Sequence, residues 1–172
     1  FHGELPAKVV ALLHGYGLKK VVFLGTGGGL SGPQQRYQWA LPSTTMRVDG
    51  AGTISQQAEF NNLACKLPQA SLGEVVVDTT HATVDSALVE TSPWTQAALD
   101  NKIGTVDCEL SHVVTTVNSL SIALYALINV TDFPRPVGLR PPDQGAIGLG
   151  NDDIQGSRIA AALDAIMAQI DE

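Results

Sequence analysis

Short, uninterrupted apolar runs alternate along this chain with amphipathic segments, and this alternation constrains the fold most. The apolar runs have the composition of strands buried on both faces, and they lie at 20–24, 73–79, 103–106 and 121–130. The amphipathic segments have apolar residues at helical spacing, and they lie at 4–16, 91–101, 107–119 and 154–170. Buried strands alternating with helices predict a three-layer αβα fold. The length of 172 residues suits a single domain, residues 1–172.

The segment between residues 31 and 73 gives weaker signals. Residues 47–52 predict a turn, and residues 53–65 predict a helix with Ile54 and Leu63 facing inward. After the next strand, residues 80–86 predict a polar loop that could line a pocket. The Pro- and Gly-rich stretch at 133–150 predicts a long loop, which in a compact domain is usually functional or mobile.

Charge and cysteine usage exclude several classes of protein. The net charge of −7 and the pI near 4.9 argue against nucleic acid or an anionic membrane as a partner. Neither a signal peptide nor an apolar run of about 20 residues, the length that spans a bilayer, is visible. Cys65 and Cys108 are far apart and lack metal-ligand spacing. Reduced thiols in a cytoplasmic protein are therefore favoured over a disulfide.

A glycine-rich stretch, Gly25-Thr26-Gly27-Gly28-Gly29, directly follows the first apolar run. It predicts a turn whose backbone amides can approach an anionic ligand closely. A dinucleotide-binding turn would need a helix immediately afterwards, and Gly32 and Pro33 oppose one. A dinucleotide site, a plain tight turn and a ligand-facing loop of another kind all remain open at this point.

Two short acidic motifs mark a candidate site. Asp107-Cys108-Glu109 stands at a predicted helix start, and Thr131-Asp132 ends a predicted strand. Ligands of open α/β folds bind outside the carboxyl ends of strands, so two carboxylates at such an edge can form one site. Taken alone, Glu109 is equally well a carboxylate favoured by the helix dipole, and Asp132 a turn residue. His81 is more readily a structural histidine than a catalytic one.

These motifs, in this order, resemble those of the nucleoside phosphorylase and nucleosidase superfamily. Its members typically carry a Gly-Ser/Thr-Ala-Gly-Gly-Leu turn, a Met-Glu pair at a helix start and a Ser-Asp after a later strand. Residues 25–30 match the turn, Cys108-Glu109 matches Met-Glu, and Thr131-Asp132 matches Ser-Asp. The separation from Glu109 to Asp132, 132 − 109 = 23 residues, is that of the nucleosidase branch. The resemblance implies a three-layer αβα fold of the phosphorylase/hydrolase type with a central mixed sheet.

The resemblance also implies roles for these residues in cleaving the N-ribosidic bond of a nucleoside, more readily a purine. Glu109 would bind the ribose hydroxyls, with the Cys108 side chain beneath the sugar. Asp132 would protonate the purine at N7, which requires a raised pKa and hence a sheltered site. Thr131 would orient the Asp132 carboxyl.

Further contacts follow from the same resemblance. The amides of Gly27 and Gly28 would face phosphate in a phosphorylase or the attacking water in a nucleosidase. The loop that contains Ser86 would contact the base. No cofactor is expected beyond inorganic phosphate as a co-substrate. Homo-oligomers are the habit of the family.

The sequence also departs from the family pattern. Full-length members run well beyond 200 residues. The family's first strand, its early glycine loop, and its phosphate-binding arginine or water-activating acid would all precede Phe1. A separate N-terminal segment or chain would then complete the site. The alternative is a non-catalytic, nucleoside-binding or scaffold relative of the same fold. Cys108 in place of Met leaves more room beneath the sugar.

Overall fold

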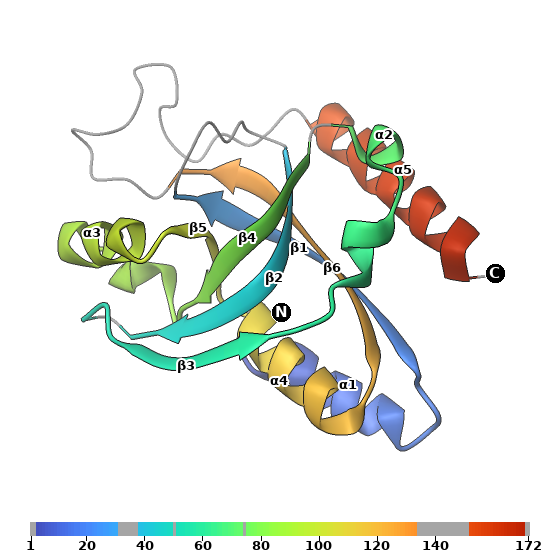
Figure 1. Ribbon diagram of the computed structural model, residues 1–172, viewed down its shortest axis with the longest axis horizontal. Helices are drawn as coiled ribbons and strands as arrows, with labels where there is room; N and C mark the ends of the chain where they lie inside the picture. The colour runs from blue at the N-terminus through green and yellow to red at the C-terminus, as the bar shows by residue number, and fades with distance from the viewer. Residues whose placement is uncertain (1–2, 31–37, 50, 74, 134–151, 171–172) are drawn as a thin grey trace.

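The computed structural model describes residues 3–30, 38–49, 51–73, 75–133 and 152–170 (Figure 1). Its strands are β1 Lys20–Gly29, β2 Trp39–Val48, β3 Ile54–Glu59, β4 Val75–Thr83, β5 Ile103–Asp107 and β6 Ala123–Asp132. Its α-helices are α1 Leu5–His14, α2 Gln69–Leu72, α3 Ser92–Asp100, α4 Leu110–Leu120 and α5 Asp152–Ile170. Two 3₁₀ turns complete the order, η1 Leu63–Lys66 and η2 Ala87–Val89.

The strands form one mixed sheet in the order β3-β2-β4-β5-β1-β6. Three neighbouring pairs are parallel, namely β2–β4, β4–β5 and β1–β6. The pairs β2–β3 and β1–β5 are antiparallel. Strand β2 also forms a short antiparallel pairing with β6, in which Trp39 pairs with Asn129 and Ala40 with Ile128. This pairing joins the edge strand β6 back to β2 and partly closes the sheet. The sheet is therefore strongly curved, with β3 outside the closed part.

Helices cover the sheet on opposite faces, as expected of three αβα layers. Strand β6 shows this best, because its side chains alternate between two cores. Leu124, Ala126 and Ile128 pack with α1 and α4. Tyr125 and Leu127 pack with η1, α2 and α5 on the other face. Figure 1 shows α1 beside α4 on one side of the sheet and α2 beside α5 on the other. The predicted three-layer fold with a central mixed sheet is confirmed.

A buried asparagine joins the two strands where the sheet curls. The Asn62 side-chain nitrogen donates to the carbonyls of Pro42 in β2 and Ala126 in β6, both at 2.8 Å. Its side-chain oxygen accepts from the amides of Ala126 and Ala64. The Asn62 side-chain amide thus bridges β2 and β6 by hydrogen bonds. It satisfies backbone groups that would otherwise be buried without partners.

The predicted helix at 53–65 is wrong. Residues 54–59 form the edge strand β3, and only residues 63–66 turn, as the short η1. The β3 side chains Ser55, Gln56 and Gln57 are exposed, so the strand lacks the apolar composition of a buried strand. Strand β2 was not predicted at all. Residues 80–83 of the predicted polar loop belong to β4 instead, and the predicted loop at 133–150 lies, apart from Phe133, outside the described residues.

The glycine-rich stretch is also not the predicted turn. Gly25, Gly27, Gly28 and Gly29 all belong to β1, and none of them has a positive φ. They permit close packing instead: a Cβ on Gly27 would lie 2.6 Å from the carbonyl oxygen of Val106 and 2.9 Å from Ile128 Cγ2. Glycine is needed here because neighbouring strands approach too closely for any side chain.

Candidate active site

The carboxyl ends of three strands meet at Gly28. This residue pairs with Val106 near the end of β5 and with Asp132 at the end of β6. The register of β1 and β6 shifts between Gly27 and Gly28, so Thr131 is an extra residue at a β-bulge. Bulges of this kind redirect side chains, and they are frequent beside active sites. The two acidic motifs predicted from the sequence therefore flank the same glycine.

A cavity of about 590 Å³ opens at this meeting point. Its volume is in the range of pockets that bind small molecules. The polar and small residues of its lining include Thr26, Gly27, Gly28, Glu90, Asp107, Cys108, Glu109, Thr131 and Asp132. Apolar side chains of β1, such as Phe23 and Leu24, complete part of the wall. The described lining contains no Lys, Arg or His.

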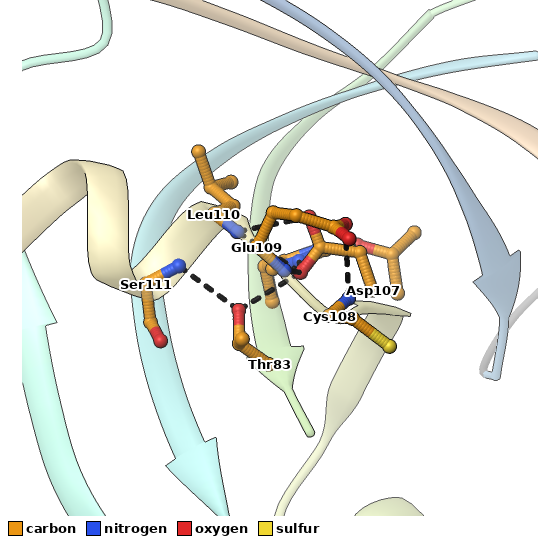
Figure 2. A network of polar contacts seen from close by, with 8 residues as sticks. Thr83, Asp107, Cys108, Glu109, Leu110 and Ser111 are labelled. Atoms are coloured by element: carbon orange, nitrogen blue, oxygen red, sulfur yellow. Dashed lines mark hydrogen bonds and ion pairs between the residues drawn. The ribbon is translucent and has the colours of Figure 1, made fainter. Parts of the chain in front are cut away.

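Asp107 is the structural support of this wall. Its carboxylate accepts hydrogen bonds from the amides of Glu109 at 3.0 Å and Leu110 at 3.0–3.1 Å, and so caps the start of α4. The Thr83 hydroxyl donates to the same carboxylate and accepts from the Ser111 amide, both at 2.9 Å. Figure 2 shows this Thr83 bridge between the end of β5 and the first turn of α4. The helix begins at Leu110, three residues later than the sequence suggested.

His81 completes the buried part of this network. Its Nε2 lies 2.8 Å from the Asp107 carboxylate, and its Nδ1 lies 2.8 Å from the Thr105 hydroxyl. Burial favours protonation of Asp107, but His81 and the capping amides outweigh it and hold the pKa of Asp107 below its ordinary value. His81 is fully buried and is not part of the described cavity lining.

Cys108 and Glu109 present their side chains at the cavity. One Glu109 carboxylate oxygen lies 3.2 Å from the Cys108 amide, which donates to it (Figure 2). Burial, followed by the Glu109 carboxylate, raises the pKa of the Cys108 thiol to about 11. Asp107 and Glu90 add to the same effect. Cys108 is therefore a neutral thiol at pH 7, suited to packing against a ligand and not to nucleophilic attack. Neither cysteine forms a disulfide.

Two further carboxyls lie across the cavity. The Thr131 hydroxyl donates to Asp132 Oδ1 at 3.2 Å, and both residues are partly buried. Glu90, between η2 and α3, lines the same cavity. Burial, reinforced by the Asp132 carboxylate, raises the pKa of Glu90 from 4.5 to about 7. Asp132 and Glu90 are thus near enough to repel each other.

The structure brings together the residues that the sequence singled out, with one exception. The exception is Ser86, whose hydroxyl accepts from the Leu88 amide and which is not part of the cavity lining; its neighbour Ala87 is. Glu90 was missed. It stands directly before the Thr91-Ser92-Pro93 helix start and after the strand that leads into the site, so the same edge rule could have included it. The described residues contain no cluster of side chains suited to a metal ion.

In the comparisons with known proteins, only solved structures match this chain. No family model matches the chain, and no curated protein sequence matches it. Among solved structures, the 5′-methylthioadenosine nucleosidase of Helicobacter pylori with 5′-methylthioadenosine in its active site has a TM-score of 0.71 and 15% identity. The match covers 98% of this chain and 74% of that one.

Two further solved structures agree. The 5′-methylthioadenosine/S-adenosylhomocysteine nucleosidase of S. pneumoniae has a TM-score of 0.69 and 17% identity over 96% of this chain and 78% of its own. The AMP nucleosidase of Bacteroides thetaiotaomicron has a TM-score of 0.69 and 18% identity over 98% of this chain and 72% of its own. This chain therefore shares the fold of these three nucleosidases.

Proposed function

We propose that this protein hydrolyses the N-ribosidic bond of a purine nucleoside. The observation that carries the proposal is the shared cavity, in which Glu109 and Asp132 lie on either side of the β1 glycines. The fold is shared with proteins that are named as nucleosidases. The function therefore rests on the arrangement of these carboxyls within that fold.

The two carboxyls suit the charges that develop during such a cleavage. The ribosyl group becomes cationic as the bond to the base breaks, and the Glu109 carboxylate, bound to the ribose hydroxyls, stabilises that charge. The departing purine gains electron density, which Asp132 neutralises by donating a proton to N7. The Thr131 hydroxyl orients the Asp132 carboxyl through its 3.2 Å contact. The neutral Cys108 thiol packs beneath the sugar.

The electrostatics of the cavity favour water over phosphate as the attacking group. Phosphate sites in proteins use Arg, Lys or a nest of backbone amides. The described lining has no cationic side chain, and the β1 glycines belong to a strand and not to a turn that forms an amide nest. Hydrolysis therefore fits the described part of the site better than phosphorolysis.

The test is release of free base from purine nucleosides, 5′-methylthioadenosine and adenosine among them, followed by chromatography with and without inorganic phosphate. We expect base release that does not depend on phosphate. Replacing Asp132 with Asn removes the proton donor and should lower kcat by about 100-fold or more, while nucleoside binding persists. Asp100→Asn, an exposed site at the end of α3, is the matched control and should retain full activity.

Two outcomes would contradict the proposal. Equal activity of the Asp132→Asn variant would remove Asp132 from the mechanism. Binding of nucleosides by the wild-type protein without any base release would instead establish the non-catalytic, nucleoside-binding alternative.

A further inference from the structure

A separate cavity of about 320 Å³ is lined by residues of α1, α4, β2 and β3, and we call it the α1–α4 cavity. Its volume is at the lower end of the range for pockets that bind small molecules. Its described lining shares no residue with that of the candidate active site. The proposed function therefore gives this cavity no task.

Cationic and titratable side chains distinguish the α1–α4 cavity from three other cavities of the molecule. Lys8 enters its lining from α1, Arg47 from β2 and His112 from α4. The described linings of the candidate active site and of two cavities beside Phe60 contain no Lys, Arg or His. The whole chain has a net charge of −7, so cations that converge from separate elements make this cavity a local exception that suits a negative ligand.

Most of the donors in the α1–α4 cavity have no partner within the described part of the chain. A guanidinium group has five N–H donors. Of those of Arg47, only Nη2 has a partner among the described residues, Asp85 Oδ1 at 3.1 Å. The ring nitrogens of the half-buried His112 likewise have no hydrogen-bond partner there. These donors are therefore available to a ligand.

The acids near the cavity are exposed and already paired. Glu4 Oε2 lies 3.2 Å from Lys8 Nζ, and the Glu4 side chain is 55% exposed. Asp85 is outside the described lining, and its side chain is 74% exposed, against 36% for Arg47. Water and salt screen exposed charges more than partly buried ones. The positive charge of Arg47 is therefore the least screened charge of the two ion pairs.

The environment of His112 agrees with this balance of charges. Burial, followed by the Arg47 charge, lowers the pKa of His112, although Glu4, Asp85 and Asp107 act in the opposite direction. Lys8 is the remaining charged residue of the cavity lining. His112 is thus held in a place that disfavours further positive charge, and a bound anion would reverse that effect.

The wall of the cavity is held by hydrogen bonds between elements. The Gln56 side-chain nitrogen donates to the Thr115 hydroxyl at 3.1 Å, and that hydroxyl donates to the Ser111 carbonyl at 2.8 Å. These bonds join β3 to α4 within the lining. The cavity is therefore formed before any ligand binds, as is usual for small-molecule sites.

We propose that the α1–α4 cavity binds a phosphate group, with Arg47 as its main ligand and His112 and Lys8 as further donors. A phosphate group offers at least three acceptor oxygens, which suffice for donors from three elements, whereas a carboxylate offers two. The planar guanidinium matches two of these oxygens at once. Bound phosphate competes with Asp85 for Arg47 and favours the protonated form of His112.

The first experiment follows His112 by proton–carbon NMR while inorganic phosphate is added at constant ionic strength, without a nucleoside. The signal is assigned through His112→Gln. We expect a saturable shift of this signal, and a midpoint of its pH titration that rises by about 1 pH unit when phosphate is bound. Acetate at the same ionic strength should produce neither change. A His112 signal that responds equally to acetate and phosphate, or to neither, would overturn the site.

The second experiment measures the Kd of phosphate from the same signal in two pairs of variants. Arg47→Gln should weaken binding by about 10-fold or more, whereas Lys66→Gln, an exposed cation outside the cavity, should leave it within two-fold. Asp85→Asn removes the competing carboxylate and should tighten binding about three-fold, whereas the exposed Asp100→Asn should not.

A gain of affinity in Asp85→Asn cannot come from misfolding, so it supports the site even if Arg47→Gln proves unstable. Equal effects of Arg47→Gln and Lys66→Gln, or no gain in Asp85→Asn, would overturn the role of Arg47.

Ribose 5-phosphate then identifies the source of the phosphate group. Tighter binding of ribose 5-phosphate than of inorganic phosphate, read from the His112 signal, assigns the cavity to a phosphate monoester. Weaker binding assigns it to free phosphate. All of these measurements report binding without turnover, so they stand whether or not the protein releases base from nucleosides.

Discussion

The Asp107 carboxylate is next to the candidate site in sequence, yet its polar contacts belong to the scaffold. It accepts from Thr83, Glu109 and Leu110, and it pairs with His81. A buried carboxylate with this many donors is stabilising only while all of them remain in place. Each of these donors would lose its partner if the side chain were removed.

We therefore expect Asp107→Ala to lower the free energy of unfolding by about 3 kcal/mol or more, since several buried donors become unsatisfied. The matched control is Asp85→Ala. Asp85 forms an ion pair with Arg47 at 3.1 Å, but its side chain is 74% exposed. Exposed pairs contribute about 0–1 kcal/mol. Urea denaturation of the two variants measures the difference, and equal losses would show that the Asp107 network does not support the fold.

At the scale of single elements, β1 decides the shape of the site. Its glycines allow β5 to approach so closely that Gly28 pairs with Val106 while it also pairs with Asp132. Any side chain at Gly27 would meet a backbone carbonyl, which has no rotamer that could move aside. The lack of a Cβ thus places the two acidic motifs beside one cavity.

Gly27→Ala should accordingly destabilise the protein by about 1–3 kcal/mol, the usual cost of overpacking, and should move β5 away from β1. The same substitution at Gly156 in α5 is the control. A Cβ there meets open space, so Gly156→Ala should stabilise the helix by up to about 1 kcal/mol. Thermal unfolding of both variants provides the comparison. A neutral Gly27→Ala would show that the strands can separate without cost.

At the scale of the whole molecule, the curved sheet holds several buried or partly buried carboxyls whose effects on stability oppose each other. The pKa of Asp107 lies below 3.8, so its contribution is complete above that pH and is lost as the pH falls through the lower folded value. The pKa of Glu90 is raised from 4.5 to about 7. Its contribution is complete below pH 4.5 and is lost as the pH rises through about 7.

The difference in Tm between wild type and Glu90→Gln isolates the second effect. Between pH 4.5 and about 7 the wild type should lose stability relative to the variant, because ionised Glu90 is desolvated and repelled by Asp132. Differential scanning calorimetry from pH 3 to 8 measures this. A difference in Tm that stays constant across this range would contradict the raised pKa of Glu90.

The length and hydropathy of the helices bear on membrane insertion. No helix among the described residues is both long and apolar enough to cross a bilayer. Several large apolar side chains of α1 are exposed, among them Leu5, Leu12 and Leu13. The expectation of a homo-oligomer stays a prediction.

The sequence by itself determined which segments are buried strands and helices, and thereby the three-layer fold. Continuous apolar runs and helical spacing are local signals, so β4, β5 and β6, as well as α3 and α5, could be predicted. It also predicted Glu109 and Asp132 as site residues, because strand ends carry ligand sites in such folds, and their roles stay predictions. The edge strand β3 could not be predicted, since its exposed polar side chains have no strand period.

Only the tertiary structure decided what the glycines and the acids do. The composition of the β1 glycines predicts a turn, but they form part of a strand. They allow close packing against backbone atoms of strands that are distant in sequence. The different properties of the acidic residues likewise depend on burial and on contacts with residues from other elements. His81 and Thr83 make Asp107 structural, while nearness to Asp132 sets Glu90 apart. Neither burial nor such nearness is a property of local sequence.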